Sequence, residues 1–124
     1  QPCPELAGLI EQGHLDDHFV RDVCTEYLEP LLSREIEVVV LGCTHFPFVQ
    51  PLLEELTSGR IQFIDPAFET SELVRRRLEG KDLFNPQKTA GTVSLYFTKD
   101  IELGDTLSAS FLDTSRRSIE HITL

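Results

Sequence analysis

The sequence contains no methionine, and it opens on Gln1-Pro2-Cys3-Pro4 without anything that resembles a translation start. We therefore expect a fragment of a longer polypeptide. The chain also lacks long apolar runs. No stretch approaches the roughly 20 residues that span a bilayer, and no signal-peptide pattern opens it. A membrane partner is therefore not expected.

Positive charge is scarce. Eleven Lys and Arg residues stand against 21 Asp and Glu residues, for a net charge of −10. Nucleic acid and anionic membrane surfaces repel such a chain, so neither is expected as a partner. Three cysteines cannot all pair internally, which fits a reducing cytoplasm. Cys43 and His45 supply only two ligands, and no other Cys/His pair has zinc-like spacing, so no metal site is expected.

The remaining composition, 40% hydrophobic and 26% charged, is ordinary for a globular protein. Apolar periodicity predicts helices over 15–32 and 49–56, a third helix from Thr70 or Ser71 to Gly80 with inward Leu73 and Val74, and a weaker one over 102–112. Strands are predicted over 38–41, 61–64, 93–98 and 119–124. Alternating strands and helices indicate an α/β fold with a mainly parallel sheet and flanking helices.

The stretch from Val38 to Pro47 combines a strand pattern with reactive side chains. Four apolar residues predict a strand buried on both faces, Gly42 allows a turn, and Pro47 suits the first turn of a helix. A thiol at Cys43 would then lie where open α/β sheets bind ligands, and a helix amino end would stabilise its thiolate. His45 is close enough in sequence to polarise it. The alternative is a small buried cysteine that only packs, the role expected of Cys3 and Cys24.

The string Leu41-Gly42-Cys43-Thr44-His45-Phe46-Pro47 resembles the second-cysteine signature of the cofactor-independent glutamate racemases, within the aspartate/glutamate racemase superfamily. Further segments are similar to that family: Pro2–Leu6 with Glu11–Gly13, Ile61–Thr70, Tyr96–Asp100 and Ile119–Ile122. The resemblance covers nearly the whole chain. It implies the C-terminal half of a racemase-like α/β protein.

The resemblance also implies an incomplete fragment of a two-domain protein. Residues 1–60 would be part of the second α/β domain and carry the Cys-Thr-His motif, and residues 61–124 would return to the first domain. Neither sheet would be complete, so exposed edges should favour self-association. The expected partners are the missing N-terminal half and, in the parent protein, a second copy forming a homodimer.

The activity implied is racemisation of glutamate, without a cofactor, by proton transfer between two cysteines; in the family it supplies D-glutamate for peptidoglycan in the cytoplasm. Cys43 matches one of these cysteines. Thr44 and His45 would contact the substrate, and Glu11 matches an auxiliary acid/base. The family's other catalytic cysteine has no counterpart here, so this chain alone should not complete racemisation.

Three alternatives stay open. The first is an aspartate racemase or related isomerase. Such proteins often carry an acidic residue at the position of His45, so the histidine in this chain favours glutamate. A Cys-His hydrolase or transferase would use Cys43 as nucleophile and His45 as base, although no third orienting group is evident in the sequence. A non-catalytic binding or regulatory domain could retain the motif.

Overall fold

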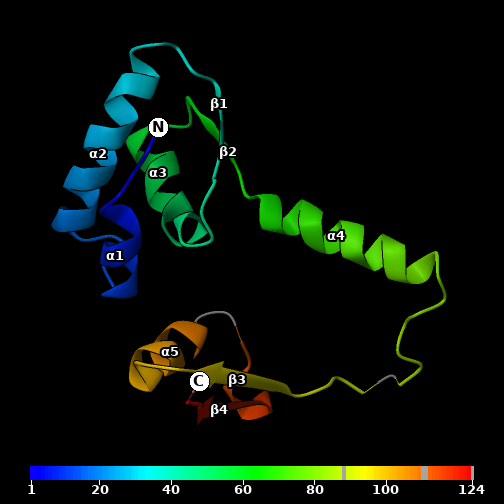
Figure 1. Ribbon diagram of the computed structural model, residues 1–124. Helices are drawn as coiled ribbons and strands as arrows, with labels where there is room; N and C mark the ends of the chain where they lie inside the picture. Colours follow the sequence, from blue (N-terminus) through cyan, green and yellow to red (C-terminus); the bar gives the residue numbers. More distant parts are fainter. Residues whose placement is uncertain (88, 110–111, 124) are drawn as a thin grey trace. The chain divides into compact units, whose positions relative to one another are not determined.

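The computed structural model describes residues 1–87, 89–109 and 112–123, which form two compact units, Gln1–Leu83 and Phe84–Leu124. The first unit contains α1 (Leu6–Glu11), α2 (His18–Leu32), β1 (Val38–Val40), the 3₁₀ helix η1 (Phe46–Val49), α3 (Gln50–Leu56), β2 (Gln62–Ile64) and α4 (Pro66–Glu79). The second contains β3 (Val93–Phe97), α5 (Ile101–Ala109), the 3₁₀ helix η2 (Thr114–Arg116) and β4 (Arg117–His121) (Figure 1). The division expected between residues 60 and 61 concerns the domains of a longer protein and stays a prediction.

In the first unit, β1 and β2 pair in parallel, with Val39 opposite Phe63. The chain leaves β1, passes through η1 and α3, and returns to β2, as parallel pairing requires. Helices α1, α2 and α3 gather beside the strand pair in Figure 1. The core consists of apolar residues from these elements: Leu6, Ile10, Val20, Cys24, Leu28, Leu41, Val49, Leu52, Leu53, Ile61 and Phe63.

The helices start at identifiable caps. Asp17 caps α2, where its carboxylate accepts hydrogen bonds from the N–H groups of Phe19 (3.0 Å) and Val20 (3.3 Å). Asp65 caps α4 by accepting from Ala67 N–H at 2.9 Å, with proline at the first helical position. The prediction that α4 begins at Thr70 or Ser71 was therefore wrong, because an aspartate followed by proline both ends the strand and starts the helix.

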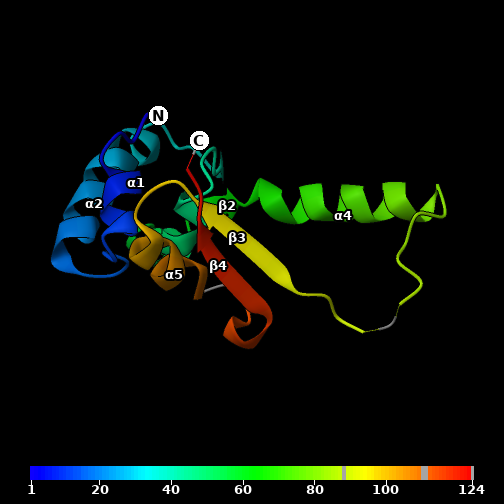
Figure 2. The same cartoon turned by 60° about the horizontal axis from the view of Figure 1, so that its bottom comes forward.

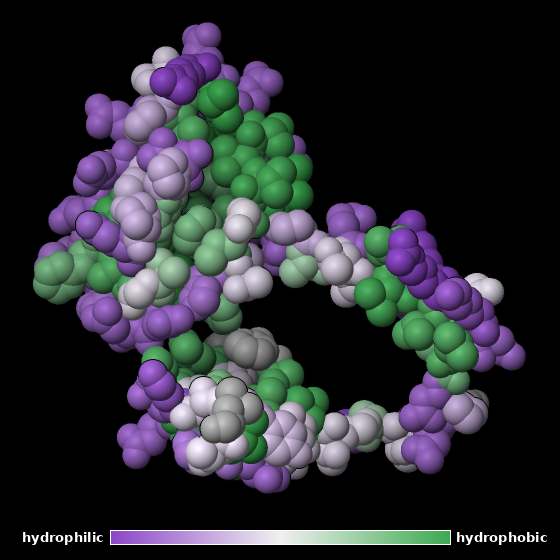
Figure 3. Space-filling model, in the orientation of Figure 1, coloured by the Kyte–Doolittle hydropathy of each residue, from purple (hydrophilic) through white to green (hydrophobic). Residues whose placement is uncertain are grey.

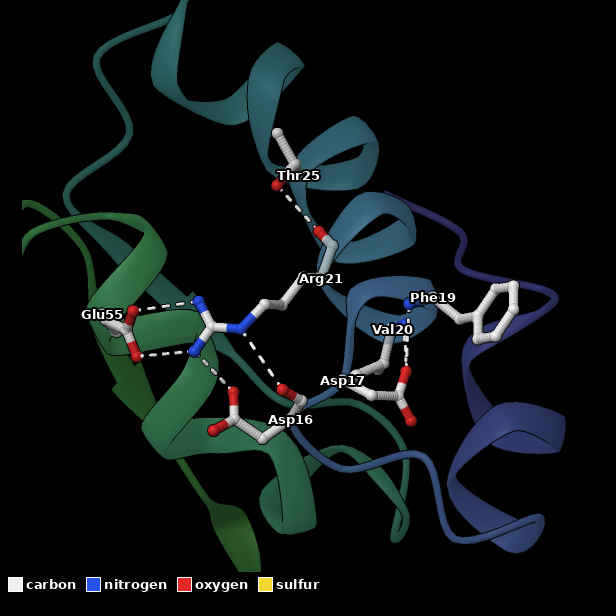
Figure 4. A network of polar contacts seen from close by, with 7 residues as sticks. All are labelled: Asp16, Asp17, Phe19, Val20, Arg21, Thr25 and Glu55. Atoms are coloured by element: carbon white, nitrogen blue, oxygen red, sulfur yellow. Dashed lines mark hydrogen bonds and ion pairs between the residues drawn. The ribbon is translucent and has the colours of Figure 1, made fainter.

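Arg21 joins α2 to α3. Its guanidinium donates to both carboxylate oxygens of Glu55, at 2.9 and 3.0 Å, and to Asp16 at 2.6 Å (Figure 4). Its Nε also donates to the backbone carbonyl of Asp16. These contacts raise the pKa of Arg21 further above its usual value. A rigid fork with several partners fixes the position of one helix against the other more closely than a single ion pair can.

One face of the β1–β2 pair is open. Val38 is 50% exposed and Val40 60%, and Ile64 on β2 lies beside Val40, whereas Val39 and Phe63 face the helices. Figure 3 shows a hydrophobic area, drawn in green, over β1 and β2. The expectation that this strand is buried on both faces was wrong for the chain as it stands, because helices cover one face only. Leu73 and Val74 of α4 are also exposed, contrary to the expectation that they point inward.

The second unit is built on the parallel pair β3–β4, which Figure 2 shows side by side. Helix α5 packs beside them, and Gly104 lies against the ring of Phe97. Arg117 binds Asp105 and Ser108 of α5, which ties the helix to β4. Both strand pairs are parallel, which confirms the predicted α/β class with parallel pairing. The predicted helix over 102–112 and strand over 119–124 each extend into positions outside the described residues.

Within the described ranges, no helix has both the length and the apolar composition needed to cross a membrane.

Candidate functional site

The turn after β1 carries the reactive side chains. Leu41 is buried, and its N–H donates to Ile64 O at 2.9 Å, which holds the end of β1 against β2. The backbone then turns at Gly42, and Phe46 N–H donates to Cys43 O at 3.2 Å. Cys43 therefore lies at the carboxyl edge of a parallel strand pair, the usual position of ligand sites in α/β sheets.

The helix behind this turn differs from the prediction. Pro47 lies in η1, a four-residue 3₁₀ helix, and the α-helix begins three residues later at Gln50. The predicted order of strand, turn and helix is therefore present, with a 3₁₀ turn before the α-helix.

Three of the residues that the sequence pointed to form one chain of contacts. Cys43 Sγ lies 3.6 Å from His45 Nδ1, and His45 Nε2 lies 2.8 Å from Glu11 Oε1. Glu11 is the last residue of α1, and α1 packs against η1, so tertiary packing brings it to a histidine 34 residues away. An ionised carboxylate only accepts hydrogen bonds, so Glu11 places the proton of neutral His45 on Nε2. His45 Nδ1 is then free to accept the Cys43 proton.

The three side chains are accessible. Cys43 is half-buried, while the side chain of His45 is 31% exposed and that of Glu11 46%. The thiol is therefore not the fully buried cysteine of the packing alternative. Cys24 is that cysteine: it is 0% exposed, and burial raises its pKa to about 11.

Two cavities meet at Cys43. One, of about 580 Å³, is lined mainly by apolar side chains of β1, α2 and the N-terminal segment. The other, of about 690 Å³, is lined by Thr44, Asp65, Thr70 and Ser71 among others. Thr44 is exposed at its edge, so the sequence-predicted residues Glu11, Cys43, Thr44 and His45 all lie at one place.

Polar residues that follow β2 also lie at the candidate site, although the sequence analysis did not place them there. Asp65, Thr70 and Ser71 line the second cavity together with Cys43. The signal was available, because parallel strands end at the same edge of a sheet and Asp65 directly follows β2. Among the described residues, no group of three or more His, Cys, Asp or Glu side chains is arranged to hold a metal ion.

No protein-family model matches this sequence. Curated relatives do. A glutamate racemase of Levilactobacillus brevis is 30% identical over 98% of this chain and 44% of its own length. Another, from Clostridium perfringens, is 36% identical over 77% of this chain and 36% of its own length. The chain thus spans less than half the length of these relatives.

Solved structures agree. Glutamate racemase of Francisella tularensis, crystallised with D-glutamate, superposes with a TM-score of 0.84 at 26% identity, over 99% of this chain and 45% of that one. The Thermus thermophilus glutamate racemase, in complex with β-chloro-D-alanine, gives a TM-score of 0.79 at 30% identity, over 98% and 46%. This chain is therefore a homologue of glutamate racemases that matches under half of their length and has the fold of the matching part.

Proposed function

We propose that this chain supplies one of the two proton-transfer groups of a cofactor-independent glutamate racemase, with Cys43 as the acid/base at the substrate Cα. The observation that supports this most directly is the line of contacts from Glu11 through His45 to Cys43. The homologues are glutamate racemases, and that of Francisella tularensis was crystallised with D-glutamate.

The chemistry follows from these contacts. A hydrogen on a carbon beside a carboxylate is only weakly acidic, so a neutral thiol is too weak a base for it. His45 Nδ1 takes the proton of Cys43, and the carboxylate of Glu11 stabilises the imidazolium that results. The thiolate then takes the Cα hydrogen as a proton. In the reverse direction the Cys43 thiol returns a proton to Cα, while Thr44 and His45 contact the substrate.

Inversion also needs an acid on the opposite face of Cα, and we assign it to the part of the parent protein that lies outside this chain. Cys24 is fully buried in the core and Cys3 lies in the N-terminal segment, and neither follows a strand and a glycine. The open apolar face around Val38, Val40 and Ile64 supports a further packed segment on β1 and β2. We propose that the N-terminal half of the parent covers it, that this chain alone is inactive and self-associates, and that the parent is a homodimer.

In this proposal the substrate is a free amino acid, glutamate, and the product is D-glutamate for peptidoglycan in the cytoplasm. No cofactor or metal takes part, because both proton-transfer groups are thiols of the protein. The imidazole of His45 beside Cys43 favours glutamate over aspartate, since aspartate-specific members of the superfamily often carry an acidic residue at this position.

The test mixes this chain with a separately produced N-terminal half of the parent protein in deuterium oxide. Exchange of the Cα hydrogen is followed by mass spectrometry for both enantiomers of glutamate and of aspartate. We expect exchange of glutamate in the mixture, none with either half alone, and none with Cys43→Ala. Cys3→Ala is the matched control and should retain exchange. Unchanged exchange with Cys43→Ala would remove this thiol from the mechanism, and preferred exchange of aspartate would reassign the substrate.

The structure also strengthens the hydrolase or transferase alternative. Glu11, already a candidate acid/base, takes the place of the third orienting group, so nucleophile, base and carboxylate stand in the order that covalent catalysis uses. Incubation with a thioester decides between the two functions. An acyl group on Cys43 that forms and hydrolyses, without Cα exchange in the mixture, would favour this alternative. The absence of both reactions would favour a binding domain.

A further inference from the structure

All three cysteines of the chain border the same cavity. Cys3 enters it from the segment before α1, Cys24 from α2, and Cys43 from the turn after β1. The cavity holds about 580 Å³ and its other walls are mainly apolar. All three are free thiols. Cys24 packs in the core and Cys3 packs against it, yet their shared position with Cys43 also places three thiols around one cavity.

The three thiols differ in how freely they can react. Cys24 is held in the middle of a helix and is completely buried, and burial raises its pKa to about 11, so it is rarely ionised. Cys3 and Cys43 are both half-buried and both lie outside helices and strands. A disulfide between them needs an α-carbon separation of about 4.4–6.8 Å.

Cys3 is an electrostatic neighbour of both other thiols. Burial is the main cause that raises the pKa of Cys3; the amino terminus opposes this, and the nearby Cys43 adds to the increase, as Cys3 does to the raised pKa of buried Cys24. Cys3 Sγ makes one long contact, 3.7 Å to Gln1 O, which leaves its sulfur weakly held. Cys43 in turn has His45 Nδ1 at 3.6 Å, a group that can accept its proton.

We propose that Cys43 and Cys3 form a reversible disulfide when the protein meets hydrogen peroxide. This would block the thiol to which we assign proton transfer, so its effect on activity rests on the proposed function, whereas the bond itself does not.

The steps balance with peroxide as the oxidant. The Cys43 thiolate attacks one peroxide oxygen, the O–O bond breaks, and hydroxide leaves to become water, which gives a sulfenic acid on Cys43. The Cys3 thiolate then attacks that sulfur, the S–S bond forms, and a second hydroxide leaves as water. Two thiols are oxidised, and one peroxide is reduced to two waters. A dithiol reductant reverses the reaction by thiol–disulfide exchange.

The experiment treats the full chain with equimolar hydrogen peroxide at low protein concentration. Free thiols are blocked with N-ethylmaleimide, and the chain is digested without reductant and mapped by mass spectrometry. We expect a cross-linked pair of peptides containing Cys3 and Cys43, which dithiothreitol separates. Cys24→Ser should keep this cross-link. Cys3→Ser should abolish it and leave Cys43 as the sulfenic acid, which a second equivalent of peroxide converts to the sulfinic acid.

The proposal fails if Cys43 in the unsubstituted chain stays a sulfenic acid, or goes on to the sulfinic acid, while Cys3 stays free. It also fails if either cysteine pairs with Cys24, or if the cross-link forms only between two chains. The peptide map needs no substrate and no second half, so it reads the disulfide even if racemisation is absent. Conversely, Cα exchange lost with Cys43→Ala but no Cys3–Cys43 cross-link would leave the proposed function intact and refute the switch alone.

Discussion

The carboxylate of Glu11 offers a direct test of how Cys43 is activated. Replacing Glu11 with alanine removes the partner of His45 Nε2, so the imidazolium that receives the thiol proton loses its stabilising charge. The pair is partly exposed, 31% for His45 and 46% for Glu11, which limits it to about 0.2–1 kcal/mol. At about 1.36 kcal/mol per tenfold, the thiolate fraction of Cys43 should fall about 1.4- to 5-fold.

The assay is the rate of alkylation of Cys43 by iodoacetamide, because the thiolate is the reacting form. The Cys43 peptide is quantified by mass spectrometry, so the other cysteines do not interfere. Glu5→Ala, at the opposite end of α1, is the matched control, since Glu5 makes no side-chain cap and is exposed. We expect a slower rate with Glu11→Ala, no change with Glu5→Ala, and no further effect of Glu11→Ala in a His45→Asn background. A rate equal to that of the unsubstituted chain would refute the activation of Cys43 through His45.

Three further predictions concern packing, reactivity and pH. A methyl group at Gly104 would lie 2.5 Å from a ring carbon of Phe97, so Gly104→Ala should lower the free energy of unfolding, measured in urea, by about 1–3 kcal/mol. Gly8 lies in a helix with open space around it, so Gly8→Ala should raise the free energy of unfolding by about 0.5–1 kcal/mol. Native Cys24, with a pKa of about 11, should resist iodoacetamide at about pH 8, near the pKa of a free thiol, and react after unfolding. The hydrogen bond from His14 lowers the pKa of Asp17, and backbone N–H groups add to this. The pKa of Asp17 is lower in the folded chain than in the unfolded chain, so its contribution to stability is complete above about pH 4 and is lost as the pH falls through the folded pKa. The urea midpoint of Asp17→Asn should therefore not show this dependence on acid pH.

Local patterns predicted most of the elements, because periodicity and caps are written in neighbouring residues. The strand before Gly42, the long helix ending at Leu32 and the strand pair at 93–98 and 119–124 all appear, with shifts of a few residues at their ends. The start of α4 was predicted too late, at Thr70 or Ser71, because Asp65-Pro66 was not interpreted as a helix start. That error concerns the interpretation of a signal that the sequence contained.

Burial was harder to predict, because it depends on what packs against an element. Four apolar residues in a row suggested a strand covered on both sides, yet Val38 and Val40 face outward in this chain. The relatives that the chain matches are more than twice as long as this chain.

The roles of the candidate site residues stay a prediction, and their geometry could not be predicted from the sequence. The resemblance singled out Glu11, Cys43, Thr44 and His45, but no spacing rule relates a helix end to a turn 34 residues later. Whether Glu11 touches His45 at all depends on how α1 packs against η1. The contact matters because it decides which nitrogen of His45 faces the thiol.

The fork of Arg21 has a consequence for Cys43 that charge alone would not suggest. A lysine at this position would keep the charge but could not hold both oxygens of Glu55 and reach Asp16 in the same plane. With lysine at position 21, α3 would stay packed in the core, but its angle to α2 would be less closely fixed. Helix α3 continues directly from η1, so a change in its angle would also displace the turn that carries Cys43. Arg21→Lys would then slow the reactions of Cys43 although it preserves the charge and lies far from the thiol.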